Sequence, residues 1–320
     1  YGMADFAAQE EMYRNTGYWW AKDDSRIVFT RTDESGVNLV SRYEIGADGV
    51  TTVEQRYPFA GTPNAILQMF VMELESGETR EIDLGEDTDI YLARVNTSPD
   101  GTIAVQRQSR DQRTLELIFV DPESLEQSVV LTETQPNWVN LHSDLTFIDE
   151  GAQFIWTSER SGFNHIYLYQ KDGKLVRQLT DGAWMVAQTS RSGAGVRAVD
   201  EENGVVWFIG WRDTPTENHL YRVPLEGGEV TQVTESGGWH QASVAPDGSF
   251  FVDSGQAPLR PPYTAIHSAE GELLTYITEN ALNDDHPSAP FVDGHRPFSF
   301  DSIKTGDGTR LHYQVALPAD

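Results

Sequence analysis

The sequence predicts an all-β fold made of β-propeller blades. A fixed order of turn, strand and aromatic strand recurs from about residue 90, with 44 to 54 residues between units. No stretch after the first turns of the chain has the 3.6-residue apolar period of a long helix. A β-sandwich is the structural alternative, but a sandwich would not repeat the same order of elements.

Each repeat begins at an acidic turn with glycine, at residues 99–101, 149–151, 202–204 and 246–248. A strand follows, and then an aromatic-rich strand at residues 115–120, 165–169, 219–223 and 263–267. Each unit closes on an apolar residue and a threonine, namely Thr132, Thr180, Thr234 and Thr278. Four short strands in a unit of this length are typical of a propeller blade. We expect the strand after each threonine to pair in the next blade.

The N-terminal part predicts one further blade around residues 15–90. A strand is expected at 26–31, a longer hairpin at 37–56 and a strand at 68–74. The total is therefore about four and a half to five blades. Residues 280–290 read as a polar linker, and a hairpin at 297–317 lies outside the repeat as the first strands of a second domain. The chain does not start with Met, and we expect both ends to be cuts in a longer protein.

Composition limits the possible partners. The 320 residues contain 23 Lys and Arg against 50 Asp and Glu, for a net charge of -27. This balance disfavours nucleic acid and anionic membrane surfaces as partners, and favours cationic ligands. No apolar run is long enough for a membrane span. The chain has no cysteine, so disulfides and thiolate chemistry are excluded within it.

The opening segment at residues 5–14 reads as one or two helical turns that carry two adjacent carboxylates, Glu10 and Glu11. Asp5 is a candidate N-cap, and Phe6, Met12 and Tyr13 can hold one side of the segment. Side chains of adjacent helical residues point about 100° apart, so both carboxylates cannot bury on one apolar face. They are either a solvated pair or two groups that flank one cation.

For other polar residues, the sequence gives weaker evidence of a functional role. His142 follows Trp138 in a loop between strands, a position that predicts solvent exposure. His165 and His219 occupy the same place in two repeats, which predicts a structural role. Arg110 could form an ion pair that stabilises a blade. The run Asp284-Asp285-His286 has metal-ligand residue types but no second cluster, so we expect neither a metal nor a cofactor.

Several motifs together resemble the dipeptidyl peptidase IV family of serine exopeptidases. The most specific are residues 9–12, Gln-Glu-Glu-Met, and residues 158–167, Ser-Glu-Arg-Ser-Gly-Phe-Asn-His-Ile-Tyr. Further motifs that carry the resemblance are Trp19-Trp20, Leu179-Thr180 followed by Trp184, and Asp307-Gly-Thr309 before Leu317-Pro318. The resemblance covers nearly the whole chain. Asp-Gly turns and Leu-Thr ends are shared with many other propellers.

The resemblance implies an eight-bladed propeller that caps an α/β-hydrolase domain, with the active site between them. Residues 1–290 would be part of the propeller, and residues 291–320 the start of the catalytic domain. Glu10 and Glu11 would bind the free α-amino group of a peptide that is cut after its second residue, preferably Pro or Ala. His142 would lie among the extended substrate subsites. The hairpin at 37–56 would be the arm used for dimerisation in a homodimer. The resemblance also favours a periplasmic or secreted location.

The residues of a serine hydrolase active site are missing from the sequence. It contains no Gly-x-Ser-x-Gly, the motif that usually places the nucleophile. The resemblance places the Ser, Asp and His downstream and a substrate-binding arginine in earlier blades. We therefore expect no peptidase activity from these 320 residues alone. Two alternatives remain, a related acylaminoacyl peptidase or endopeptidase, and a non-catalytic propeller that acts as a binding scaffold.

Overall fold

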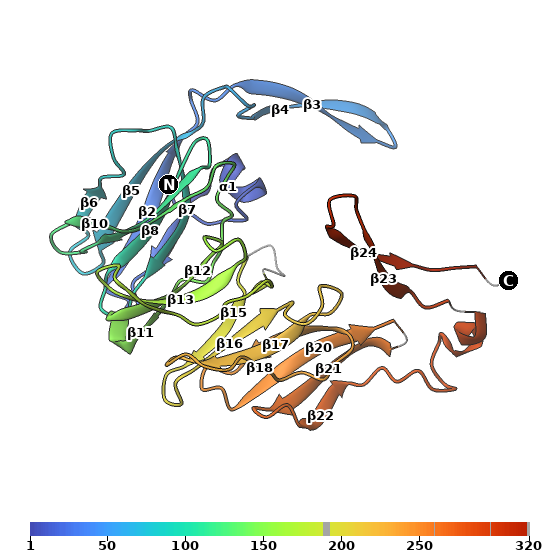
Figure 1. Cartoon of the computed structure of the whole chain (residues 1–320). Coiled ribbons are helices and arrows are strands. Elements are labelled where there is room, and N and C mark those ends of the chain that lie inside the picture. Colours follow the sequence, from blue (N-terminus) through green and yellow to red (C-terminus); the bar gives the residue numbers. More distant parts are fainter. Residues whose placement is uncertain (188–192, 259, 295, 319–320) are drawn as a thin grey trace. The chain divides into compact units, whose positions relative to one another are not determined.

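The computed structural model describes residues 1–187, 193–258, 260–294 and 296–318 (Figure 1). Strands in these residues form five four-stranded sheets and two separate two-stranded hairpins. Five sheets agree with the four and a half to five blades that the repeat predicts. The chain divides into two compact units, and each is described by itself: Tyr1–Phe154 with Tyr169–Lys174, and Ile155–Leu168 with Leu175–Asp320.

The first unit contains two complete sheets. The first sheet has the order β1-β2-β5-β6, with β1 Tyr18–Trp20, β2 Arg26–Asp33, β5 Ile66–Glu73 and β6 Thr79–Ile82. The second has the order β10-β9-β8-β7, with β7 Ile90–Thr97, β8 Ile103–Ser109, β9 Thr114–Val120 and β10 Gln127–Thr134. All their pairings are antiparallel. The predicted hairpin is β3 Leu39–Gly46 with β4 Gly49–Arg56, which projects from the first sheet as a separate ribbon (Figure 1).

A third sheet has the order β11-β12-β13-β14, and the division between the units runs through its strands. These are β11 Thr146–Ile148, β12 Gln153–Ser158, β13 His165–Gln170 and β14 Leu175–Gln178, with a short 3-10 turn, η1 Asp149–Gly151, between the first two.

The second unit contains the remaining sheets. The fourth comprises β15 Val196–Asp200, β16 Val205–Gly210, β17 His219–Pro224 and β18 Thr231–Gln232. The fifth comprises β19 Trp239–Val244, β20 Phe250–Ala257, β21 Arg260–Ser268 and β22 Leu273–Thr278. A 3-10 turn, η2 Ala289–Gly294, precedes the final hairpin of β23 Ser299–Lys304 and β24 Arg310–Val315. The hairpin stands outside the four-stranded sheets, as predicted.

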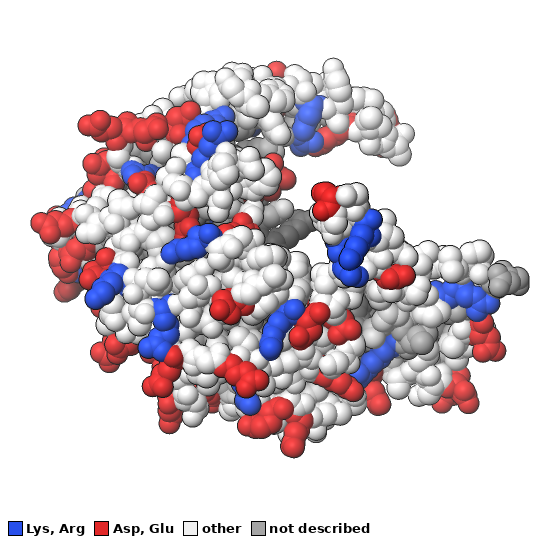
Figure 2. Space-filling view, viewed as in Figure 1, with Lys and Arg blue, Asp and Glu red and all other residues white. Residues whose placement is uncertain are grey.

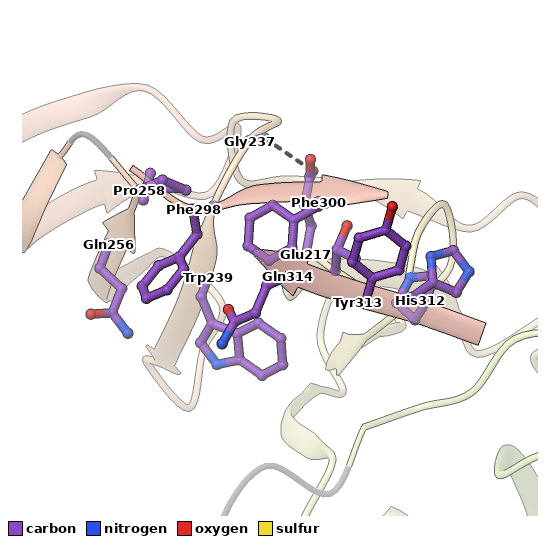
Figure 3. Close-up of a pocket in the computed structure, with 14 residues that line it drawn as sticks. Glu217, Gly237, Trp239, Gln256, Pro258, Phe298, Phe300, His312, Tyr313 and Gln314 are labelled. Carbon is purple, nitrogen blue, oxygen red and sulfur yellow. Dashed lines mark hydrogen bonds between the residues drawn. The ribbon is translucent and has the colours of Figure 1, made fainter. Parts of the chain in front are cut away.

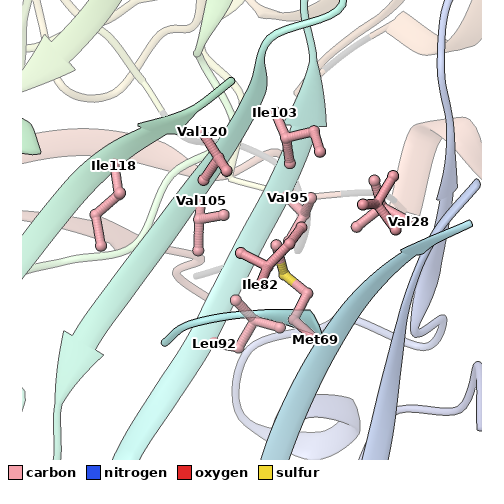
Figure 4. Close-up of a cluster of buried hydrophobic side chains, with 10 residues drawn as sticks. Val28, Met69, Ile82, Leu92, Val95, Ile103, Val105, Ile118 and Val120 are labelled. Carbon is pink, nitrogen blue, oxygen red and sulfur yellow. The ribbon is translucent and has the colours of Figure 1, made fainter. Parts of the chain in front are cut away.

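The strand after a closing threonine does open the next sheet. β11 follows Thr132, β15 follows Thr180 and β19 follows Thr234. In the first unit the side chains of two sheets share one core, which contains Met69, Leu92, Ile103 and Val120 (Figure 4). Alternate residues of a strand face opposite sides, so a sheet covered by neighbours on both faces reads as a nearly continuous apolar run. This explains the run of buried residues along β8 and β9.

Arginine side chains add links from one sheet to the outer turn of another. In the first unit, Arg80 of β6 donates to the carbonyl of Pro122 at 2.7 Å and to that of Glu123 at 2.5 Å. In the second unit, Arg222 of β17 donates to the carbonyl of Ala269 at 3.2 Å. These bonds satisfy turn carbonyls that have no partner within their own sheet.

A histidine and the closing threonine form the same contacts in two repeats. Nδ1 of His165 lies 3.1 Å from the hydroxyl of Thr180, and Nδ1 of His219 lies 3.0 Å from that of Thr234. Each hydroxyl also accepts the backbone N–H of the residue after the histidine, at 3.0 and 3.2 Å. Burial lowers the pKa of His165, which favours its neutral form. The structural role predicted for both histidines is confirmed.

Replacing either buried threonine by valine should destabilise the fold. Thr180→Val and Thr234→Val each leave a buried histidine nitrogen and a buried N–H without a partner, at a cost of about 1–3 kcal/mol. The second sheet supplies a control, because its closing Thr132 is exposed and pairs with Glu116 instead of a histidine. Thermal unfolding of the three variants should show a lower Tm for the first two only. An equal effect for Thr132→Val would contradict this explanation.

Candidate functional site

The carboxylate pair lies at the end of a five-residue helix, α1 Phe6–Glu10, in which Glu10 is the last residue and Glu11 is the C-cap. Asp5 is its N-cap, as predicted, and accepts the backbone N–H of Ala8 at 3.0 Å. Ala8 and Met12 are buried with Ala4 against Ala93 of β7. These contacts attach the helix to the edge strand of the second sheet.

The helix ends in a tight turn. The backbone N–H of Arg14 donates to the carbonyl of Ala8 at 2.9 Å. This closure requires Tyr13 to adopt a left-handed conformation, with φ at 53°, which non-glycine residues rarely do. Glu10 and Glu11 therefore lie within a short segment that is closed at both ends.

Glu10 and Glu11 are both exposed. Neither carboxylate makes a hydrogen bond or ion pair with any residue that the structure describes, in contrast to Asp5 on the same helix. The buried face of α1 is made by Ala8 and Met12, so the two carboxylates stay in solvent, as their spacing predicts. Two adjacent acceptor groups with unused lone pairs can bind a donor that has several N–H bonds, such as an ammonium group.

Arg14 is the last residue of this segment, and the sequence alone did not identify it as a functional residue. Its side chain is buried and makes two bonds to backbone carbonyls, from Nε to Leu92 at 3.1 Å and from Nη1 to Thr16 at 2.8 Å. Nη2 lies 3.8 Å from Oδ2 of Asp5, the N-cap. Burial lowers the pKa of Arg14 from its usual value, and the nearby Asp5 opposes this shift.

His142 does not have the exposure that its loop predicts. Only 4% of the residue is exposed, and burial together with the charge of Arg94 lowers the pKa of its ring to about 3. The ring is therefore neutral near pH 7. The next residue, Ser143, accepts a hydrogen bond from Nε of Arg94 at 3.0 Å. The loop thus packs inward, and the expectation of solvent exposure was wrong because loop position does not reveal a buried polar partner.

The two remaining polar candidates are structural in the described part of the chain. Arg110 forms the predicted ion pair, at 3.1 Å from Asp89, and also donates to the carbonyl of Thr62 at 3.0 Å. Nε2 of His286 lies 3.1 Å from the amide oxygen of Asn280. The described residues contain no group of three or more His, Cys, Asp or Glu side chains that could hold a metal ion.

The second unit has a separate pocket of about 800 Å³ (Figure 3). Its walls include aromatic side chains from separate elements, namely Trp239 of β19, Phe298 just before β23, Phe300 of β23 and Tyr313 of β24. Glu217 supplies a carboxylate, but one of its oxygens already accepts the N–H of Gly237 at 3.1 Å and bonds His219 at 2.9 Å. The pocket combines apolar surface with polar side chains of Gln256, His312 and Gln314.

Acidic side chains are scattered over the face in Figure 2, with basic ones between them, and are not massed over one element. The acidic side chains seen on this face are therefore exposed to solvent. Across the described ranges, no helix has the length and apolar character needed to cross a membrane.

Comparison with known proteins gives consistent results. Residues 1–262 match the model of the dipeptidyl peptidase IV (DPP IV) N-terminal region. A probable dipeptidyl-aminopeptidase B of Emericella nidulans is 30% identical over 307 residues, which cover 87% of this chain and 33% of that protein. The dipeptidyl-aminopeptidase B of Aspergillus niger is 26% identical over 325 residues, covering 92% of this chain and 35% of that protein.

Solved structures show the same fold. The crystal structure of Porphyromonas gingivalis dipeptidyl peptidase 4 matches with a TM-score of 0.87 at 23% identity, over 99% of this chain and 44% of that one. A putative dipeptidyl aminopeptidase IV from Bacteroides ovatus matches with a TM-score of 0.79 at 21% identity, over 98% and 46%. The four-stranded sheets are therefore propeller blades. The chain spans about a third of the length of the curated relatives it matches.

Proposed function

The chain belongs to the dipeptidyl peptidase IV family, as part of its N-terminal region, and we propose that it is the substrate-gating propeller portion of a serine exopeptidase. The intact enzyme would release dipeptides with Pro or Ala in second place from peptides that have a free N terminus. The observation that carries this proposal is the pair of exposed, unpartnered carboxylates of Glu10 and Glu11 at the end of a short helix that is fixed at both ends.

The chemistry of the pair suits a protonated α-amino group. An ammonium group has three N–H donors and no acceptor, and two carboxylates supply only acceptors. Hydrogen bonds to charged groups contribute about 1.5–3 kcal/mol each. A peptide with an acetylated N terminus would lose the charge and most of these donors. It would also desolvate the two carboxylates without compensation.

A fixed amine site also determines where the peptide is cut. The α-amino group lies a set number of bonds from the second peptide bond, so holding the amine places that bond at a defined distance. In this proposal Glu10 and Glu11 select the cleavage position and do not take part in bond breaking.

We place the reacting groups in the rest of the parent protein. The sequence lacks Gly-x-Ser-x-Gly, and we propose that residues 291–320, with the β23–β24 hairpin, begin the α/β-hydrolase domain that carries the Ser, Asp and His. Residues 1–320 alone would then release no dipeptide. A substrate contact from His142 also remains a prediction, with little exposed surface to support one.

Cleavage of matched peptides by the intact protein tests the proposed function. We expect release of the dipeptide from Ala-Pro peptides with a free N terminus, and a loss of at least about 100-fold in kcat/KM when the same N terminus is acetylated. Mass spectrometry of the products measures both. Equal cleavage of the acetylated peptide would instead support an acylaminoacyl peptidase or endopeptidase, and no cleavage of either would support a binding scaffold.

A further inference from the structure

We propose that Arg14 is a positioning residue for Glu10 and Glu11, an inference that rests on the amine-binding role proposed above. Arg14 would not touch the substrate. It would hold the helix that carries the two carboxylates, so that both reach the same ammonium group.

The helix cannot hold this geometry by itself. A helix of five residues is far below the length at which an isolated helix is stable in water. Its position must therefore come from contacts with the rest of the unit. Small apolar contacts of Ala8 and Met12 with Ala93 fix the depth of the helix, but such contacts have little directional preference. Directional contacts are needed to fix its rotation along β7.

Arg14 supplies directional contacts through its side-chain hydrogen bonds to the carbonyls of Leu92 and Thr16, and its charge lies near the start of the helix. Its own backbone N–H closes the C-terminal turn on Ala8 at 2.9 Å, three residues after Glu11. Its Nη2 faces the N-cap carboxylate of Asp5 at 3.8 Å. Its Nε donates to the carbonyl of Leu92 in β7 at 3.1 Å. The side chain thus connects the blade beneath the helix with Thr16 after its turn and lies next to the N-cap, while the backbone N–H closes the turn itself.

Stability alone does not account for a guanidinium at this place. The side chain is buried, its charge lies near that of Arg94, and burial lowers its pKa. Nη2 makes no hydrogen bond to a described residue, and the ion pair with Asp5 is long. A buried charge compensated in this way often stabilises a fold less than an apolar side chain of similar volume. The planar group does offer several donors in fixed directions, a property that suits positioning.

The predicted consequence is a selective loss of substrate binding. If Arg14 acts through Glu10 and Glu11, then removing it lets the carboxylates shift relative to β7. Loss of one hydrogen bond to a charged group weakens binding by about 10- to 100-fold. The effect should appear in KM for substrates with a free amine, because the groups that break the bond are unchanged.

Steady-state kinetics of the intact parent enzyme with Ala-Pro-p-nitroanilide test this proposal. We expect Arg14→Met to raise KM by about 10- to 100-fold and to change kcat less than about threefold. Arg14→Lys should restore part of the loss, because lysine keeps the charge but cannot donate to Leu92 and Thr16 in the same fork geometry. If Arg14→Met does not yield folded enzyme, then Arg14→Lys alone should still raise KM.

A matched control and a double-mutant cycle separate positioning from general destabilisation. Arg80→Met removes another arginine that bonds two backbone carbonyls and faces a carboxylate, Glu73, and it should leave KM unchanged. In a background of Glu10→Gln with Glu11→Gln, Arg14→Met should raise KM by less than about threefold.

Three outcomes are decisive. A higher KM in the Arg14 variants, with kcat changed less than about threefold and KM of Arg80→Met unchanged, supports the positioning role of Arg14. The inference is overturned, while the amine site stands, if the Arg14 variants lower Tm but leave KM unchanged, as Arg80→Met does. It is also overturned if Arg14→Met raises KM by the same factor in the Glu10→Gln with Glu11→Gln background as in the wild-type enzyme. If the glutamine pair itself leaves KM unchanged, the proposed function fails, and the inference fails with it.

Discussion

Replacing Glu10 and Glu11 together by glutamine should lower kcat/KM of the intact enzyme for Ala-Pro-p-nitroanilide by about 10²- to 10⁴-fold. Glutamine keeps the size of the side chain but removes the negative charge. Two hydrogen bonds to a charged group contribute about 3–6 kcal/mol together, and each 1.36 kcal/mol corresponds to a factor of ten. Each single substitution should have a smaller effect than the pair.

The control for this experiment is Glu75→Gln. Glu75 is also an exposed carboxylate without a described partner, in the turn between β5 and β6 of the same unit. Its replacement should leave kcat/KM unchanged and shows whether loss of one negative charge from the propeller matters in general. Full activity of the double glutamine variant would remove the basis for the amine site.

The β3–β4 hairpin should be needed for dimerisation of the intact protein. Register pairs Ile45 with Val50 and Tyr43 with Thr52, so these side chains share one face of the ribbon. Tyr43 is 70% exposed, Ile45 83% and Val50 63%. A two-stranded ribbon with an uncovered apolar face and free edges is marginally stable and prone to pair with another chain. We propose a second copy of the same chain as its partner.

Tyr43→Asp with Ile45→Asp should convert the dimer to a monomer, because each new carboxylate would be desolvated in the interface. Light scattering after size-exclusion chromatography measures the mass. Thr51→Asp is the control, because Thr51 pairs with Glu44 on the opposite face of the ribbon. A dimer that persists in the double aspartate variant, or a wild-type protein that is monomeric at all concentrations tested, would refute this role of the hairpin.

The sequence predicts the fold well because the repeat is a local pattern. Turns, alternating strands and closing threonines each depend on a few consecutive residues, and the strands of the five sheets form where these patterns occur. The fixed distance from His165 to Thr180 and from His219 to Thr234 reflects two paired strands and their turn. Contacts between sheets are different in kind. The bonds from Arg80 to the turn at Pro122 join residues 42 positions apart, and no local pattern indicates them.

The site shows the same limit. Asp5 could be predicted as an N-cap because capping depends on residues three positions apart. Arg14 could not be recognised, because its partner Leu92 is 78 residues away. His142 was misjudged for the same reason: its burial depends on packing with residues outside its loop, including Arg94. Long-range contacts decide which polar residues of this chain are buried, and composition or spacing does not reveal them.

The shortness of α1 has a consequence for how the protein matures. The helix has too few residues to form before the strand beneath it, and its packing on Ala93 and the bond from Arg14 to Leu92 exist only when β7 is in place. A chain in which that blade has not yet folded would present two carboxylates without a fixed spacing. Under the proposed function, the amine site would therefore form only after β7 has folded, and a chain in which β7 is not in place would not bind a substrate.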